Sequence, residues 1–378
     1  MDLTVQYGKI KEEVKNRIDD VFENQRFILG PNVEGLEEEV AGYCGTRYGI
    51  GVASGSDALL LSLMALGISW NDTVVTTPNT IFSTAGSIVR LGAHPIFVDI
   101  DPGTYNIDPN RLEDLLKELS TNQDPQFRFP KAIIPVHLFG QCADMGPILE
   151  IAERFEIKVI EDAAQAFGAE YCGKMVGSIG DTGCFSFFPS KNLGGVGDGG
   201  MVTTNDKTTS ERLRMLRGHG SDMKYYHKMV GLNSRLDEVQ AACLRVKLKY
   251  LDGWIERRRQ NADIYQRLFQ EKGLADLICL PHAEQGMGHT YNQFVVRVPE
   301  RDALREYLMK KGIGTEVYYP IPLHLQKAFD FLGYKEGAFP HSEKSAEDVL
   351  ALPIYPELTK VQQEYVVNSI RDFYGGRR

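Results

Sequence analysis

Residues 185–200 read FSFFPSKNLGGVGDGG and place one lysine, Lys191, between an aromatic run and a glycine-rich stretch. A lysine among aromatic side chains is costly unless its amine is used or paired, because burial disfavours the charged form. The glycines at 194, 195, 197, 199 and 200 let the backbone turn tightly and approach a ligand closely. The stretch therefore predicts either a surface lysine beside a flexible loop or a reactive amine in a dry pocket.

The bulk composition sets limits on both alternatives. The chain has 378 residues, 43% of them hydrophobic, which is enough for one large and one smaller domain. Its net charge of -9 argues against a nucleic-acid or anionic-membrane partner. We find no apolar run long enough to span a membrane, and the charged start is unlike a secretion signal, so we expect a cytoplasmic protein. Six scattered cysteines without CxxC spacing predict neither a metal site nor a disulfide framework.

Strand-like and helical patterns alternate along the first part of the chain, which predicts an α/β layered fold. Short β-rich runs at 73–78, 94–101, 131–140 and 157–164 are each followed by a turn or a helical pattern. After Arg235 a long charged helical pattern begins, in which Gly253 marks an expected bend. We expect it to lead from a large domain, residues 1–250, to a smaller α+β domain, residues 251–378. The smaller domain contains a predicted strand at 290–298, a predicted helix at 301–312, and within 313–324 a predicted strand that ends in a Pro-rich loop.

Two acids and a glutamine follow the strand-like run that ends near Ile160. Open α/β sheets bind ligands at the carboxyl ends of their strands, where Glu161 and Asp162 are expected to lie. An acid there can hold a positive charge on a ligand, and Gln165 can hydrogen-bond the same ligand. The alternative is that Asp162 caps the following turn.

A further motif, Ser54-Gly55-Ser56, precedes an apolar helix. The unpaired amides and the dipole of such a helix favour a phosphate, although the same residues also suit an ordinary helix cap. Phe82 follows a strand end and either lies flat on a planar cofactor or fills the core. The chain lacks the GK[ST] of a P-loop. A lysine amine, an acid after a strand and a phosphate-ready helix start together match the needs of pyridoxal 5'-phosphate (PLP).

Eight motifs make the assignment specific: ILGPNVEGLEEEVA, ASGSDAL, VDIDPGTYNID, PVHLFGQCADM, IEDAAQAFGA, FSFFPSKNLGGVGDGGMVTTND, GLNSRLDEVQAA and YYPIPLHLQ. In these motifs and their order the chain resembles the DegT/DnrJ/EryC1/StrS family of PLP-dependent sugar aminotransferases over nearly its full length. The resemblance implies the fold of type I PLP-dependent transferases. It also implies a Schiff base on Lys191 and a carboxylate, Asp162, facing the pyridine nitrogen.

The remaining cofactor contacts follow from the same resemblance. It implies that Gln165 contacts the ring hydroxyl, that Phe82 stacks on the ring, and that the phosphate is bound by Gly55, Ser56 and Ser186. Asn233 is implied to reach the phosphate of the neighbouring subunit's cofactor, which predicts a homodimer with shared active sites. Arg235 is a candidate for the diphosphate of the substrate, or else it pairs with Asp237 or Glu238.

The resemblance implies transfer of an amino group from L-glutamate to a nucleotide-linked keto sugar. A 3-oxo sugar is favoured over a 4-oxo sugar, and UDP and dTDP remain open as the nucleotide. Candidates for the sugar are Tyr318, Tyr319 and His324; the alternative is that the two aromatics pack and His324 caps the loop. Two other functions remain open: an NAD-dependent sugar dehydrogenase or epimerase, disfavoured because the first strand-to-helix unit lacks a G-x-G-x-x-G turn, and a non-catalytic PLP-binding regulator.

Overall fold

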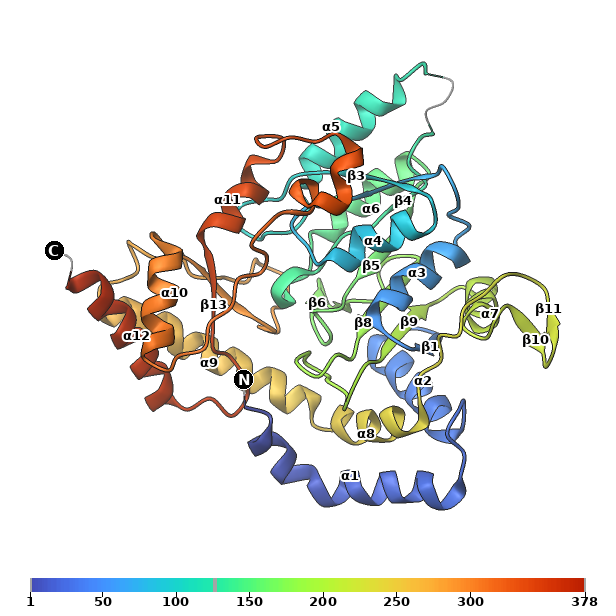
Figure 1. The fold of residues 1–378 in the computed structure, drawn as a ribbon, viewed down its shortest axis with the longest axis horizontal. Helices are drawn as coiled ribbons and strands as arrows, with labels where there is room; N and C mark the ends of the chain where they lie inside the picture. Colours follow the sequence, from blue (N-terminus) through green and yellow to red (C-terminus); the bar gives the residue numbers. More distant parts are fainter. Residues whose placement is uncertain (1, 125–127, 377–378) are drawn as a thin grey trace.

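The computed structural model describes residues 2–124 and 128–376, and within them a seven-stranded sheet forms the centre of the fold (Figure 1). The strand order is β1-β9-β8-β5-β4-β2-β3. β9 is antiparallel to its neighbours β1 and β8, and the other pairs are parallel. The predicted α/β class with a mostly parallel sheet is confirmed. The strands of this sheet are β1 Tyr48–Val52, β2 Thr73–Thr76, β3 His94–Phe97, β4 Ala132–Ile133, β5 Lys158–Asp162, β8 Thr182–Ser186 and β9 Gly200–Thr204.

Helices cover both faces of this sheet. The α-helices are α1 Thr4–Asn24, α2 Pro31–Cys44, α3 Gly55–Ala65, α4 Phe82–Arg90, α5 Pro109–Ser120, α6 Met145–Arg154, α7 Lys207–Leu216, α8 Glu238–Leu248, α9 Leu251–Glu271, α10 Arg301–Lys310, α11 Pro340–Asp348 and α12 Lys360–Gly375. One buried cluster joins α2, α5, α6 and α8 to one side of the sheet, and another joins α3, α4 and α7 to the opposite side. Burial on both faces explains why sheet strands such as β2, TVVT, are apolar without alternation.

The C-terminal part has its own core. It is built from α9, α10 and α12 around a two-stranded sheet of β12 Phe294–Arg297 and β13 Val349–Leu352. Short elements complete the described chain: β6 Glu170–Tyr171, β7 Lys174–Met175, β10 Ser221–Met223, β11 Tyr226–His227 and the 3-10 turns η1 Leu138–Gly140, η2 Leu323–Leu325 and η3 Lys327–Leu332. The core of this part also includes Ile100, Val136 and Phe139 from the N-terminal part. The division into two domains at residues 250 and 251 stays a prediction.

Two local expectations were wrong. The helix expected to bend at Gly253 is interrupted earlier, between Leu248 and Leu251, and continues without a break through Gly253. The strand predicted at the start of 313–324 is reduced to one bridge between Glu316 and Ala351, and the Pro-rich part of the segment is irregular, as expected.

Residues 323–345 pack back onto the sheet. Phe329 and Phe339 lie in a buried cluster with Phe97 of β3 and Ala85 of α4. The carboxylate of Asp99, which is buried, accepts hydrogen bonds from the backbone N–H groups of His341 and Ser342, both at 2.9 Å. An acceptor in this position pairs with backbone N–H groups that would otherwise be unpaired at the start of α11. Its negative charge also interacts favourably with the helix dipole. This contact fixes a C-terminal helix beside the carboxyl end of β3.

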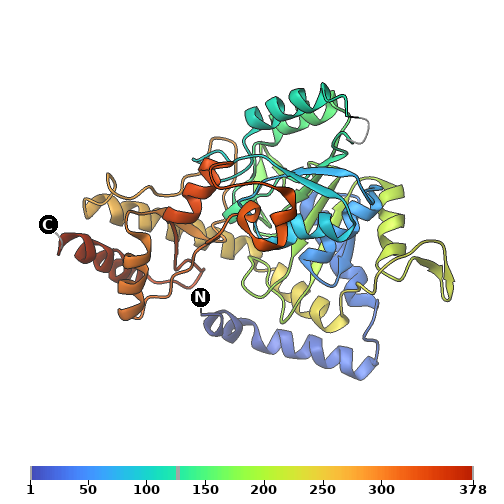
Figure 2. The same ribbon diagram turned by 45° about the horizontal axis from the view of Figure 1, so that its top comes forward.

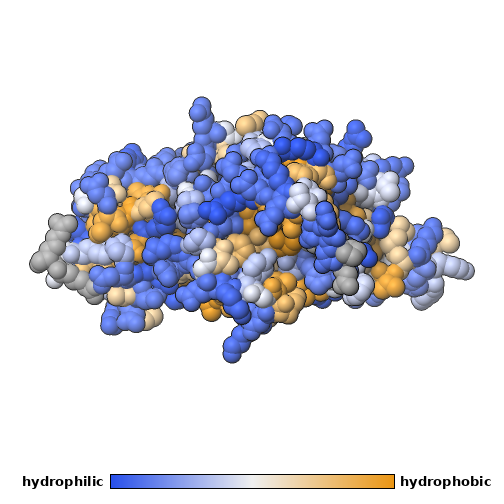
Figure 3. Space-filling model, turned by 90° about the horizontal axis from the view of Figure 1, so that it is seen from above, coloured by the Kyte–Doolittle hydropathy of each residue, from blue (hydrophilic) through white to orange (hydrophobic). Residues whose placement is uncertain are grey.

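The molecular surface is mixed in character. The face seen in Figure 3 is mostly hydrophilic with scattered hydrophobic patches. The β10–β11 hairpin projects from the body of the molecule in both ribbon views (Figures 1 and 2), and it exposes Met223, Tyr225 and Tyr226. Within the described residues, we find no helix long and apolar enough to cross a membrane.

Candidate active site

A cavity of about 320 Å³ lies at the carboxyl ends of β5 and β8. It brings together residues that are far apart in the sequence, from the first turn of α3 to the loop before η2. Its lining consists of Ser54, Gly55, Ser56, Leu59, Thr80, Ile81, Ser83, Val136, Asp162, Ala164, Gln165, Ser186, Phe188, Ser190, Lys191, Asp198, Gln293, Tyr318 and Tyr319. Among these are six residues that the sequence indicated for the cofactor site and two indicated for the sugar.

Lys191 lies in the loop that follows β8 and reaches into this cavity. Burial lowers the pKa of its amine to about 8, and the negative charge of Asp162 opposes part of that shift. An amine with this pKa loses and regains a proton near neutral pH, as a covalent catalyst requires. Of the two alternatives raised by residues 185–200, the structure supports the reactive amine.

Asp162 is the last residue of β5 and is 2% exposed. Its carboxylate accepts hydrogen bonds from the Thr84 hydroxyl at 2.8 Å and from the Ala164 N–H at 3.3 Å. Burial raises the pKa of Asp162, while the bond from Thr84, the bond from Ala164 and the charge of Lys191 act in the opposite direction. The bond to Ala164 means that the expected turn cap is present as well, so the two interpretations of this acid are compatible.

The neighbouring acid, Glu161, faces away from the cavity, since successive residues of a strand point to opposite sides of the sheet. Its two carboxylate oxygens accept backbone N–H groups of Gly177, Ile179 and Gly180, each at 2.8 Å. One of them also lies 3.0 Å from Nε2 of the buried His137. These contacts anchor the end of β5 from the opposite side, which gives Glu161 a structural function.

Gln165 is held on both sides of its amide. Its Oε1 accepts the N–H of Phe139 at 2.8 Å, and its Nε2 donates to the hydroxyl of Tyr319 at 3.0 Å. The sequence indicated Gln165 and Tyr319 separately, one for the cofactor and one for the sugar. No local signal could have shown that they bond to each other, because they come from different parts of the fold.

The first turn of α3 forms one end of the cavity. Ser54 caps the helix by accepting the N–H of Asp57 at 3.1 Å. Within the described residues, the N–H groups of Gly55 and Ser56 have no protein acceptor, so they remain available to an anion. A side chain at Gly55 would place its Cβ 2.6 Å from Cβ of Ser186, so glycine is required where β8 meets the helix. The proposed phosphate residues Gly55, Ser56 and Ser186 therefore converge.

The glycine-rich stretch after Lys191 is braced by α8. Gln240 accepts the N–H of Val196 at 2.9 Å, and Nζ of Lys247 donates to the carbonyl of Gly194 at 2.5 Å. A Cβ on Gly194 would lie 2.3 Å from the carbonyl oxygen of Pro189. The stretch is therefore a tightly fitted turn that positions Lys191.

Two of the expected site residues are not among those that line the cavity. Phe82 does not line it; its ring centre lies 5.1 Å from that of Phe329, and the preceding residue, Ile81, lines the cavity instead. His324 is buried elsewhere, with Nε2 at 2.9 Å from Glu343 Oε1 and its ring against Phe339. The packing of His324 against Phe339 accounts for its position, whereas Phe82 remains 51% exposed and its stacking on the cofactor stays a prediction. For His324, the structural alternative fits the observed contacts.

Asn233 and Arg235 lie outside the cavity of their own chain. Asn233 is exposed and bridges to Gly218, whereas the adjacent Ser234 is buried and donates to Asp57 at 2.7 Å. Within the described residues, no ion pair joins Arg235 to Asp237 or Glu238, and the carboxylate of Glu238 instead accepts the N–H groups of Asn32 and Val33. The functions expected for Asn233 and Arg235 stay predictions.

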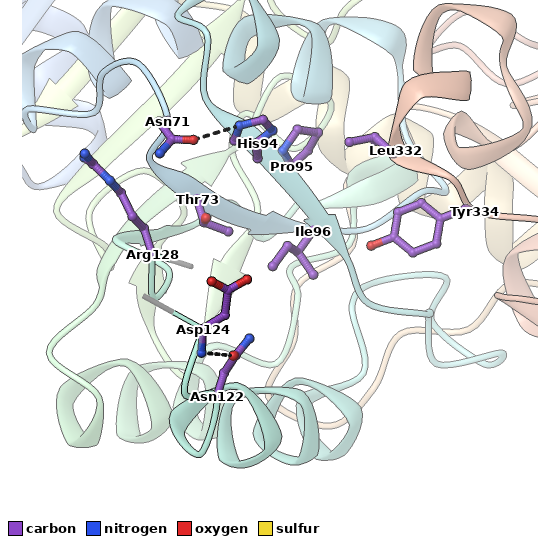
Figure 4. A pocket seen from close by; sticks show the side chains of 10 residues that line it. All are labelled: Asn71, Thr73, His94, Pro95, Ile96, Asn122, Asp124, Arg128, Leu332 and Tyr334. Carbon is purple, nitrogen blue, oxygen red and sulfur yellow. Dashed lines mark hydrogen bonds between the residues drawn. The ribbon is translucent and has the colours of Figure 1, made fainter. Parts of the chain in front are cut away.

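A second cavity, of about 370 Å³, lies at the edge strand β3 and is shown in Figure 4. There Nε2 of His94 lies 3.2 Å from Oδ1 of Asn71, and Arg128 pairs with Asp72 at 3.2 Å. The lining combines neither a desolvated lysine with a buried acid nor a helix start. We therefore place the chemistry in the cavity that contains Lys191.

The residues of that cavity fit PLP. Lys191 offers an amine that can deprotonate, Asp162 offers a buried carboxylate, and the start of α3 offers free N–H groups for a phosphate. Without a bound partner, each of these groups would destabilise the fold, because a buried charge or polar group needs a partner.

Comparisons with known proteins agree with this fit. The sequence pattern of the DegT/DnrJ/EryC1/StrS aminotransferase family matches residues 8–371. The chain is 50% identical over 374 residues to a pleiotropic regulatory protein of Geobacillus stearothermophilus, covering 99% of this chain and 98% of the relative. It is 41% identical to the UDP-N-acetyl-3-dehydro-alpha-D-glucosamine 3-aminotransferase of Acidithiobacillus ferrooxidans, covering 98% and 96%.

Solved structures give the same result. The crystal structure of DesV from S. venezuelae, in complex with a ketimine intermediate, matches with a TM-score of 0.92 at 40% identity, covering 98% of this chain and 97% of that one. NtdA from Bacillus subtilis, with bound pyridoxamine phosphate, matches with a TM-score of 0.86 at 31% identity, covering 98% and 82%. The chain therefore belongs to the DegT/DnrJ/EryC1/StrS aminotransferase family and is a PLP-dependent sugar aminotransferase with the type I fold.

Proposed function

We propose that the protein transfers the amino group of L-glutamate to a nucleotide-linked keto sugar at C3, with a UDP- or dTDP-linked 3-oxo sugar as substrate. The observation that carries this proposal is the convergence of Lys191, Asp162 and the start of α3 in one cavity. The names of several relatives support C3. They include a dTDP-3-amino-3,4,6-trideoxy-alpha-D-glucose transaminase at 40% identity and a UDP-2-acetamido-2-deoxy-3-oxo-D-glucuronate aminotransferase at 40% identity.

In the proposed mechanism, the protein supplies positioning and proton transfer. PLP, when bound, supplies a ring that accepts electrons from the reacting carbon. Lys191 would hold the cofactor through its side-chain amine, and the same amine, when free, would accept and return the proton of the reacting carbon as general base and general acid. Asp162 stabilises a positive charge on the ring nitrogen, and Thr84 fixes the carboxylate for that role. The N–H groups of Gly55 and Ser56, together with Ser186, hold the phosphate.

Asp162→Asn tests the assignment. The variant should keep its fold and lose most of its activity, because a neutral amide does not stabilise a protonated ring nitrogen as a carboxylate does. The measurement is the change in visible absorbance when glutamate is added, which follows the first half of the reaction without a sugar. Near-normal turnover with an unchanged melting temperature would leave Asp162 with its turn cap alone.

Substrate choice is tested by supplying UDP- and dTDP-linked sugars with the ketone at C3 or at C4, together with glutamate. Amination of a 4-oxo sugar in preference to the 3-oxo sugar would contradict the proposed position. Tyr318 and Tyr319 line the cavity and are the remaining candidates for the sugar among the residues indicated by the sequence.

We further propose a homodimer in which each subunit completes the other's site. Asn233 is exposed and is not among the residues that line the cavity of its own chain, which supports this proposal, and so do the exposed apolar side chains of the β10–β11 hairpin. A C₂ pair would repeat the same contact reciprocally. After subunit exchange between Lys191→Ala and Asn233→Ala chains is verified, each mixed dimer should have up to half of the activity of a wild-type dimer, because one of its two pockets carries neither change. No recovery, or a fully active monomer in sedimentation, would refute shared sites.

The Geobacillus relative is named as a regulatory protein, which keeps a second candidate function in view. A regulator without turnover would bind PLP and still fail to convert it with glutamate. The absorbance measurement above separates the two functions directly. The dehydrogenase alternative is not supported, because the family match and the related structures are aminotransferases.

A further inference from the structure

The hydroxyl of Tyr319 occupies an unusual position for a residue first indicated as a sugar contact. Tyr319 belongs to the irregular segment before η2, lines the cavity, and bonds to Gln165, which follows β5. This bond joins the C-terminal part of the chain to the central sheet inside the cavity. Because Tyr319 is already hydrogen-bonded to Gln165, it is poorly placed to adjust to different substrates.

Counting donors and acceptors shows where the Tyr319 proton is free. The N–H of Phe139 requires an acceptor, so the oxygen of the Gln165 amide faces it and the nitrogen faces Tyr319. The Tyr319 oxygen thus accepts one proton of Gln165 Nε2, and its own O–H is left to donate. Across the part of the chain that the structure describes, no protein acceptor for that O–H is found. The second proton of Gln165 Nε2 is free as well.

We propose that Tyr319 and Gln165 donate together to one oxygen, the ring hydroxyl oxygen of PLP. This inference rests on the proposed function, in which Lys191 holds the cofactor, and on the contact between Gln165 and that oxygen that the family resemblance implies. The two donor atoms are 3.0 Å apart, so a single acceptor can lie within hydrogen-bond distance of both. Burial, followed by the nearby charge of Asp162, raises the pKa of Tyr319, so the phenol remains protonated and can donate throughout the working pH range.

The consequence is electronic. Each donor stabilises the negatively charged form of the ring oxygen. This oxygen shares a proton with the Lys191 nitrogen that is bound to the cofactor, and the stabilised oxygen attracts that proton less strongly. That nitrogen therefore loses its proton at a lower pH. Tyr319 is thus expected to set the pH at which the cofactor changes its visible absorbance, before any substrate is present.

The experiment is a spectrophotometric pH titration of the PLP-loaded enzyme without substrate. Tyr319→Phe should move the absorbance transition upward by about one pH unit, the size expected for one hydrogen bond to a charged group. Tyr318→Phe is the matched control: it removes a hydroxyl from the adjacent cavity residue, whose ring lies 5.7 Å away, and should leave the transition in place. A transition that is unchanged in Tyr319→Phe, while wild type titrates, would overturn the inference alone. A wild-type enzyme whose absorbance does not report a bond to Lys191 would instead refute the proposed function.

A second comparison tests whether Tyr319 acts only by holding Gln165. In a Gln165→Ala background, Tyr319→Phe should still raise the transition if Tyr319 donates directly, and should add nothing if it acts through Gln165. The latter result would overturn the inference. Melting temperature and retained PLP confirm that each variant is folded. If Tyr319→Phe does not fold, a fluorinated tyrosine at 319, which is a stronger donor, should move the transition downward; an unmoved transition would again contradict the proposal.

Discussion

Replacing Lys191 by methionine should abolish activity and yet stabilise the cofactor-free protein. In the folded chain, burial lowers the pKa of Lys191 from 10.5 to about 8. At neutral pH the Lys191 amine is therefore charged in both the folded and the unfolded protein, but the charged form is less stable in the folded protein. The difference between the two pKa values corresponds to about 3 kcal/mol of destabilisation. Methionine has a similar length and no charge, so it removes this cost.

The net gain should be smaller than that figure, since Asp162 loses the attraction of the lysine when the charge is removed. We expect Lys191→Met to be more stable than wild type by about 1–3 kcal/mol at pH 7. Active sites often contain groups that are unfavourable for the fold, and their removal raises stability at the expense of function.

The pH dependence of unfolding provides a second test of the direction of this stability change. Between about pH 8 and 10.5 the unfolded chain keeps a proton that folded Lys191 has lost, so the unfolded state binds more protons there. Wild-type stability should therefore gain from this group as pH rises through that window, and below about pH 8 the cost is fully present. The methionine variant lacks this gain, so its advantage should shrink between pH 7 and pH 10.

The assay is urea unfolding of the cofactor-free proteins at one protein concentration, because any dimerisation would make stability depend on concentration. Contributions shared by both proteins, including other groups that titrate near pH 10, cancel in the difference. Lys335→Met, at an exposed lysine, is the matched control and should change stability little. A Lys191→Met protein that is less stable than wild type at pH 7, or an advantage that is the same at both pH values, would refute the reasoning.

Two further predictions follow from close contacts in the fold. Asp99→Ala should lower the free energy of unfolding by about 2–4 kcal/mol in urea denaturation, because the N–H groups of His341 and Ser342 lose their acceptor at the start of α11. A loss below about 0.5 kcal/mol would show that α11 does not depend on this cap. Gly200→Ala would place a Cβ 2.4 Å from the carbonyl oxygen of Ser54 and so displace the start of α3. PLP binding, measured by fluorescence titration, should weaken at least tenfold, and unchanged affinity would contradict the tight fit.

The parts of the site that the sequence predicted share one property: their signals are local. Lys191 lies in its own aromatic and glycine-rich motif, Asp162 ends an apolar strand, and Ser54 precedes an apolar helix. Parallel strands bring such strand ends to the same edge of the sheet, so local motifs were enough to group these residues. The α/β class followed in the same way from the alternation of strands and helices.

The parts that the sequence did not predict depend on distant packing. Ile81 and Phe82 are adjacent and both apolar, and only the tertiary structure shows that Ile81 lines the cavity while the ring centre of Phe82 lies 5.1 Å from that of Phe329. The bond between Gln165 and Tyr319 joins segments that have no shared pattern. The reversed direction of β9 also leaves no local trace, because an apolar strand has the same composition in either direction.

The position of β9 between β1 and β8 has a consequence for the order of events on the ribosome. Tyr48 of β1 pairs with Thr204 of β9, so one edge of the sheet cannot close until β9 has been made. At ~5–20 residues per second this leaves β1 without its partner for roughly 10–30 s during translation. Through that interval the apolar residues of β1 and α3 are exposed to other nascent chains. Translation speed through residues 50–200, and the chaperones bound there, should therefore affect the yield of this enzyme more than they affect its final stability.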